Sequence, residues 1–196
     1  RLVGPQSGAG IFTLLPSAHD PARMLALGGR EAWWLAQRDG RWQTLARWPS
    51  HVSVIDGVVQ MAAGEVWVGD ERGGAHRWRF DPLNGQLHDQ HHFGAAQGLS
   101  PDSEQSGVHL VRIDDTLYAV SGRDVRKLAG EGFVPASLPL LPGLERPWEL
   151  EARSTALGSL VWTSRQLWWR RQGGNSFQRQ EVSSSRVPGF AALALH

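Results

Sequence analysis

The stretch GEVWVGDERGGAHRWRF, residues 64–80, decides the fold that the sequence predicts. Valine and tryptophan alternate along 66–68, and apolar and arginine residues alternate along 77–80, which is the two-residue period of β-strands. Gly73-Gly74 lies between the two segments and provides the backbone of a tight turn. The stretch therefore predicts a strand, a turn and a second strand.

The same pattern recurs at residues 31–42, 116–128 and 159–169. When the four copies are aligned on one aromatic residue each, the spacings between those residues are 33, 51 and 44 positions. The aligned residues are Trp34, Trp67, Tyr118 and Trp162. Repeats of this length are typical of the four-stranded blades of a β-propeller.

We expect an all-β fold with about four propeller blades, at residues 22–55, 58–93, 108–135 and 148–182. Residues 24–27 are then the first inner strand, and residues 11–15 are the outer strand of an incomplete earlier blade. Residues 190–195 repeat the pattern of residues 24–27 and predict the first strand of a fifth blade. The sequence 1–196 is thus interpreted as one partial β-propeller, a fragment of a larger one.

The composition is that of an ordinary globular chain, with 41% hydrophobic and 20% charged residues. The formal net charge of +1 gives no support for binding to nucleic acid or to a membrane surface. Cysteine is absent, which excludes disulfides and thiolate chemistry. Ten of the seventeen aromatic residues are tryptophan, a side chain well suited to packing between sheets.

The motif GEVWVG…GAHRWRFDP at residues 64–82 resembles the two-component-regulator propeller repeat. The segment HFGAAQGLS, residues 92–100, is similar to the connection between blades in that family. The likeness covers residues 22–182, although Arg165-Gln166-Leu167 stands where the repeat usually has a glycine. In this family the propellers are extracytoplasmic sensors of membrane-bound signalling proteins.

The resemblance implies a periplasmic ligand-sensing or interaction module that has no cofactor and no catalytic activity of its own. It also implies a partner output domain, usually a histidine kinase and sometimes a diguanylate cyclase, which residues 1–196 do not contain. Homodimerisation through the full-length protein is compatible with such an arrangement. A propeller whose face docks another protein is a second interpretation.

Four arginines occupy the turns that follow the predicted second strands, namely Arg38, Arg72, Arg123 and Arg165. In propellers these turns share one face with the connections between blades, so the four would surround one rim beside the loop 94–107. We include His76 with them as candidate ligand-binding residues. Guanidinium groups bind carboxylates, sulfates and phosphates in a bidentate geometry, which indicates a small or oligomeric anionic ligand. The alternative interpretation is that turns simply favour charged residues.

The densest group of potential metal ligands is His88, Asp89, His91 and His92. If this segment is a strand, His88 and His92 share a face but stand about 13 Å apart along it. Zinc-bound nitrogens lie roughly 2.0–2.1 Å from the metal, so these two side chains cannot converge on one ion. We therefore predict a polar outer strand and no bound metal.

Glu149 and Glu151 are the candidate carboxylates for catalysis. On a predicted inner strand they would be about 6.6 Å apart, a separation that resembles the carboxylate spacing of glycosidases. The alternative is that both line a channel, partly neutralised by Arg153. Because no short hydrolase, phosphate-binding or dinucleotide motif occurs, we do not expect an enzyme. A propeller lyase, lactonase or glycosidase that acts on a sugar-like substrate is the alternative function.

Overall fold

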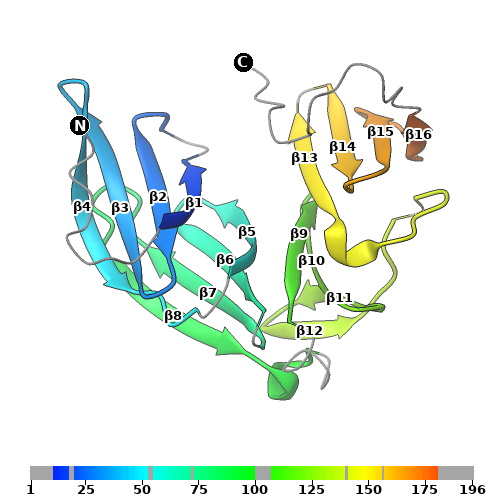
Figure 1. The fold of residues 1–196 in the computed structure, drawn as a ribbon, viewed down its shortest axis with the longest axis horizontal. Helices are drawn as coiled ribbons and strands as arrows, with labels where there is room; N and C mark the ends of the chain where they lie inside the picture. The colour runs from blue at the N-terminus through cyan, green and yellow to red at the C-terminus, as the bar shows by residue number, and fades with distance from the viewer. Residues whose placement is uncertain are drawn as a thin grey trace.

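Four antiparallel sheets of four strands each make up the described part of the chain in the computed structural model (Figure 1). The described residues are 11–17, 20–52, 55–71, 73–99, 107–139, 141–155 and 157–180. Their only helical segments are two short 3₁₀ turns, η1 (Ala95–Gln97) and η2 (Pro147–Glu149). Neither of these turns could span a bilayer.

The sheets are numbered in chain order. Sheet 1 contains β1 (Ile11–Pro16), β2 (Arg23–Gly28), β3 (Glu31–Arg38) and β4 (Arg41–Pro49). Sheet 2 contains β5 (Ile55–Ala62), β6 (Glu65–Asp70), β7 (Ala75–Phe80) and β8 (Leu87–Phe93). Sheet 3 contains β9 (His109–Ile113), β10 (Thr116–Ser121), β11 (Asp124–Ala129) and β12 (Gly132–Pro135). Sheet 4 contains β13 (Glu151–Thr155), β14 (Gly158–Trp162), β15 (Leu167–Arg171) and β16 (Gln178–Gln180).

Within every sheet the strands lie side by side in sequence order. The first strands of successive sheets contact one another, β1 with β5, β5 with β9, and β9 with β13. This arrangement is that of propeller blades around a common axis. The described residues form an open arc and do not close into a ring (Figure 1). The all-β, propeller-like fold predicted from the sequence is confirmed.

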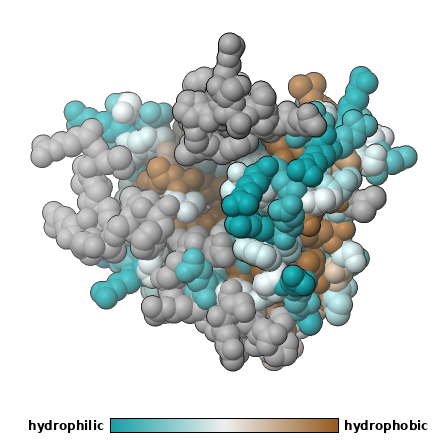
Figure 2. Space-filling model, turned by 45° about the vertical axis from the view of Figure 1, so that its right-hand side comes forward, coloured by the Kyte–Doolittle hydropathy of each residue, from teal (hydrophilic) through white to brown (hydrophobic). Residues whose placement is uncertain are grey.

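A separate apolar core fills each interface between consecutive sheets. Alternate residues of one strand serve two cores, because successive side chains point to opposite faces. On β6, Val66 and Val68 pack between sheets 1 and 2, whereas Trp67 packs between sheets 2 and 3. On the face shown in Figure 2, hydrophilic and hydrophobic side chains are interspersed.

The first sheet differs from the prediction by one strand. Residues 11–15 were expected to be the outer strand of an earlier blade, but β1 pairs with β2, with Leu15 opposite Leu25. Residues 24–27 are therefore in the second strand, and the sheet ends at Pro49 rather than at residue 55. The ambiguity arises because sheet 2 has a tryptophan on each of its two middle strands, Trp67 on β6 and Trp78 on β7, so the pattern does not show which of them Trp34 matches. In the structure Trp34 lies on the third strand, as Trp78 does. Residues 190–195 lie outside the described residues.

Contacts between segments place the turn after each second strand at one common end. Ser50 N donates to Arg30 O at 3.0 Å, which joins the end of β4 to the β2–β3 turn. Val108 N donates to Asp70 O at 3.0 Å, which joins the start of β9 to the end of β6. The chain also passes from one sheet to the next here, so we call it the connection end. The opposite end, with the β3–β4 turn and its equivalents, is called the hairpin end.

Candidate functional site

Three of the four sheets have an exposed arginine at the connection end. Arg30, Arg123 and Arg165 lie in or beside the turns that follow the second strands β2, β10 and β14, and all three side chains are exposed. Their guanidinium groups make no hydrogen bond or ion pair with the residues that the structure describes. Arg72, predicted for the equivalent turn of sheet 2, lies outside the described residues. Three cations without partners among the described residues are thus present at this end.

Arg38 does not belong to this group, which corrects the prediction. It is the last residue of β3, the third strand of its sheet, and so it lies at the hairpin end. In Figure 1 the β3–β4 hairpin and the β14–β15 turn point in opposite directions. The error follows from the one-strand shift in sheet 1. The correct strand count assigns Arg30 to the position that Arg38 was predicted to hold.

His76, the fifth predicted site residue, is buried beneath the β6–β7 turn at the connection end. Its side chain on β7 is 8% exposed, and its Nε2 lies 3.7 Å from Asp70 Oδ2. Its ring centroid is 4.8 Å from that of His92 on β8. Burial, with the additional repulsion of His92, lowers the pKa of His76 to about 4, although Asp70 acts in the opposite direction. His76 is therefore neutral at physiological pH and supports the turn from within.

The histidine-rich segment forms β8, as expected for a polar outer strand. His91 packs against Phe93 with ring centroids 4.7 Å apart, whereas His92 is the cross-strand partner of His76. His88 is exposed. Within the described ranges, no group of three or more histidine, aspartate or glutamate side chains could hold a metal ion.

Glu149 lies in η2 and not on an inner strand with Glu151, which corrects the premise of the proposed carboxylate pair. Ser164 Oγ and Arg146 Nη1 each donate a 2.6 Å hydrogen bond to Glu149. Both bonds lower the pKa of the Glu149 carboxyl, and the bond from Ser164 has the larger effect. A glycosidase acid needs a raised pKa, so this arrangement does not support the catalytic alternative.

The bond between Glu149 and Ser164 also fixes η2 against the β14–β15 turn. Trp148 of η2 is 42% exposed, and Arg165 follows Ser164 in the turn. An exposed indole and a guanidinium that has no partner in the described part of the chain are thus held on adjacent segments. The sequence gives Trp148 no place in the predicted site, because the alternation of residues 148–152 predicts a strand there. The only sequence signal for a turn there is the preceding Pro147, which favours the first position of a helical turn.

Comparisons with known proteins give structural neighbours only. No family model matches the chain, and no curated protein matches its sequence. The fold is similar to a crystal structure from B. thetaiotaomicron described as the extracellular domain of a hybrid two component system. The TM-score is 0.54 at 12% identity, over 94% of this chain and 24% of that one. It is also similar to a protein of unknown function from Bacteroides caccae, with a TM-score of 0.52 at 11% identity, over 90% of this chain and 62% of that one.

These identities show a shared fold and no more. The chain spans less than two thirds of the length of either structure. The architecture found in that extracellular domain is therefore present here. The particular repeat family that the sequence resembles has no support from a family model.

Proposed function

We propose that this chain is a non-catalytic ligand-sensing module of a bacterial signalling protein, and that it binds an anionic ligand at the connection end. The observation that carries the proposal is the presence there of three exposed guanidinium groups, those of Arg30, Arg123 and Arg165, without partners among the described residues. The similarity in fold to an extracellular domain of a two-component system supports a role in sensing.

The chemistry of the three arginines favours anions. Each guanidinium is a planar fork of donors that matches a carboxylate, sulfate or phosphate in a bidentate geometry. Because their charges have the same sign and lie at one end of the sheets, their potentials add over that surface. Trp148 provides an exposed aromatic face beside the Arg165 turn, on which an apolar ring of the ligand can stack.

We further propose an extracytoplasmic location and an output domain that is separate from residues 1–196. A ligand at the connection end would contact the turns of several sheets at once. Binding would then change how those sheets are held relative to one another, which is a signal that a joined domain can receive. Hydrogen bonds from Ser164 and Arg146 lower the pKa of the Glu149 carboxyl, the opposite of what a general acid needs, so catalysis is not part of the proposal.

Calorimetric titration of the chain with anionic and neutral probes tests this function. Oligogalacturonate and citrate are the anionic probes, and a neutral galactose oligomer is the control. We expect an anionic probe to bind, with affinity that falls as salt is added. Arg123→Gln and Arg165→Gln should each weaken binding by about tenfold or more, the loss of one charge-assisted contact.

Arg38→Gln is the matched control, because Arg38 is also exposed but lies at the hairpin end. This variant should bind like the wild type. Equal affinity for the neutral and anionic probes, or equal losses in all three variants, would contradict the proposal. Binding of a protein partner in place of every small probe would support the docking interpretation instead.

A further inference from the structure

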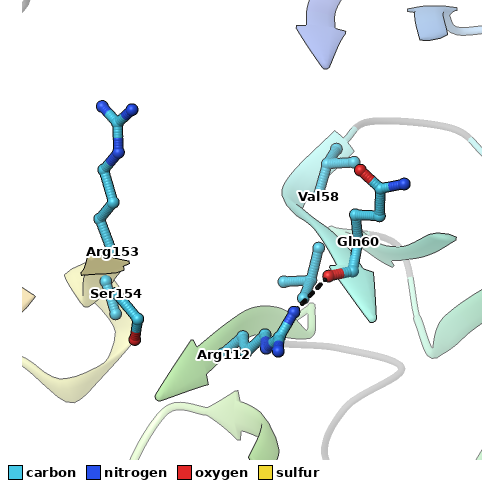
Figure 3. Close-up of a pocket in the computed structure, with 7 residues that line it drawn as sticks. Val58, Gln60, Arg112, Arg153 and Ser154 are labelled. Atoms are coloured by element: carbon cyan, nitrogen blue, oxygen red, sulfur yellow. Dashed lines mark hydrogen bonds between the residues drawn. The ribbon is translucent and has the colours of Figure 1, made fainter. Parts of the chain in front are cut away.

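A pocket of about 290 Å³ opens between the first strands of sheets 2, 3 and 4 (Figure 3). Its walls include Val58 and Gln60 of β5, Arg112 of β9, and Arg153 and Ser154 of β13. Gln60, Arg112 and Ser154 all stand late in their strands, so the pocket lies toward the hairpin end. It is therefore separate from the arginines of the connection end. Its volume is at the lower limit of small-molecule sites.

The two charged side chains in the pocket wall are both arginines. Arg112 is fixed by three hydrogen bonds, from Nη1 to Gln60 O at 2.9 Å, from Nε to Asp114 O at 2.7 Å, and from Nη2 to Asp115 Oδ1 at 2.9 Å. Its charge is thus partly compensated, and its position is set. Figure 3 shows the bond to the Gln60 carbonyl as a dashed line.

Arg153 is different. Its side chain is exposed and makes no hydrogen bond or ion pair within the described ranges. In Figure 3 it stands across the pocket from Gln60 and Arg112. The pocket wall thus contains one fixed guanidinium and a second that has no partner within the described ranges, and guanidinium groups bind carboxylates and phosphates in a bidentate geometry.

Ser154, another polar residue of the pocket wall, belongs to a hydrogen-bonded network that reaches sheet 3. Ser154 Oγ lies 3.2 Å from Ser159 Oγ, which donates to Asp114 Oδ1 at 2.8 Å. Arg170 of β15 also donates to Asp114 Oδ1, which joins sheet 4 to sheet 3. The Asp114 carboxylate is therefore neutralised by Arg170. Glu151, two residues before Arg153 on β13, is not among the residues that line the pocket.

We propose that this pocket is a second binding site, for a small multivalent anion of carboxylate or phosphate chemistry, with Arg153 as its main cationic contact. The site lies where one hydrogen-bonded network joins three sheets, from Gln60 through Arg112 and Asp114 to Ser159 and Ser154. Occupancy would clamp sheets 2, 3 and 4 together at the hairpin end. Binding in this pocket does not require a ligand at the connection end.

The test uses citrate and inorganic phosphate as separate probes of the chain, with binding followed by amide chemical shifts and calorimetry. We expect at least one probe to shift the resonances of β5, β9 and β13. Arg153→Gln should weaken that binding by about tenfold or more, and Arg153→Lys, which keeps the charge but loses the fork, by less. A citrate response alone identifies carboxylate chemistry, and a phosphate response alone identifies phosphate chemistry.

Two control variants separate this site from the proposed function. Arg38→Gln removes an exposed arginine from the same end, and Arg123→Gln removes one from the connection end; neither should change citrate or phosphate binding at the pocket. Loss of binding in Arg123→Gln but not in Arg153→Gln would overturn the pocket site and leave the proposed function standing. Failure of both probes to shift the pocket strands would also overturn it. Thermal melting of Arg153→Gln that matches the wild type ensures that the comparison is between folded proteins.

Discussion

Arg77 Nη1 donates a 2.8 Å hydrogen bond to Glu131 Oε2 and so joins β7 of sheet 2 to the β11–β12 turn of sheet 3. The guanidinium also lies 5.7 Å from the Trp67 ring centroid and 5.4 Å from that of Phe93. Only 8% of the Arg77 side chain is exposed, whereas the carboxylates of its two ion-pair partners, Asp89 and Glu131, remain at the surface. Arg77 therefore acts both as an ion-pair donor and as packing material between two sheets.

Arg77→Ala should destabilise the chain by roughly 2–3 kcal/mol, because it removes the stem and the guanidinium from between the aromatic rings. Glu131→Gln should have a much smaller effect, because Glu131 is 75% exposed and water replaces the lost charge interaction. Urea unfolding of both variants measures the difference. An equal loss in the two variants would show that the ion pair, and not the packing, dominates.

His76 makes the stability of the chain sensitive to acid. Its folded-state pKa of about 4 is below the ordinary value of 6.5, so the unfolded chain binds a proton first as the pH falls. The contribution of neutral His76 is fully present above pH 6.5 and is lost as the pH falls from there toward 4. The slope from this one group is at most about 1.4 kcal/mol per pH unit.

His76→Gln removes this titration while it keeps a polar side chain near Asp70. Unfolding midpoints measured between pH 7.5 and pH 4.5 should fall less steeply for this variant than for the wild type. His88→Gln, at an exposed position of β8, should keep the wild-type slope. Identical slopes for the wild type and His76→Gln would show that His76 is not the titrating group.

Two fully buried tryptophans differ in one hydrogen bond. Trp168 Nε1 donates to Pro142 O at 3.0 Å, whereas Trp78 Nε1 finds no partner within the described ranges. Substitution by phenylalanine leaves a similar cavity at both sites, but at Trp168 it also leaves the Pro142 carbonyl without its donor. Trp168→Phe should therefore be more destabilising than Trp78→Phe by about 1–2 kcal/mol, as measured by thermal or urea unfolding. The reverse order would contradict the hydrogen-bond assignment.

Gly98 closes the η1 turn against sheet 3 with a φ of +84°. A Cβ atom there would overlap the Phe133 carbonyl oxygen of β12. Gly98→Ala should cost more than about 3 kcal/mol, since either the turn or the strand must move. Gly122 also has a positive φ, +57°, but a Cβ there would meet open space, so Gly122→Ala should cost only about 1–2 kcal/mol. Unfolding measurements on the pair separate the effect of the clash from that of backbone conformation alone.

The sequence predicts the sheets well where strand alternation and turn residues coincide. In sheet 3, for example, Gly122 and Gly130 mark the turns on either side of β11 in short succession. In sheet 1, Trp33 and Trp34 are both buried, one on each face of β3, so alternation cannot tell which strand of the blade this is. Because of that ambiguity, the sequence predicts Arg38 for the connection end, where the structure has Arg30.

The candidate sites depend on contacts between segments that are distant in the sequence. The neutral state of His76 follows from its burial and from its contact with His92, which pattern alone does not reveal. The pocket beside Arg153 needs three strands from three sheets. The alternation of residues 148–152 predicts a strand, whereas Pro147 begins the 3₁₀ turn η2, which contains Trp148.

The alternation of side chains between neighbouring cores makes the fold a one-dimensional series of links. Val66 and Val68 pack sheet 2 against sheet 1, and Trp67 packs the same sheet against sheet 3. Each sheet therefore packs directly against its neighbours in the series. The folding free energy then approximates a sum of sheet terms and nearest-neighbour terms. Sheets 2 and 3, each packed against a described neighbouring sheet on both faces, should therefore exchange their amide hydrogens most slowly.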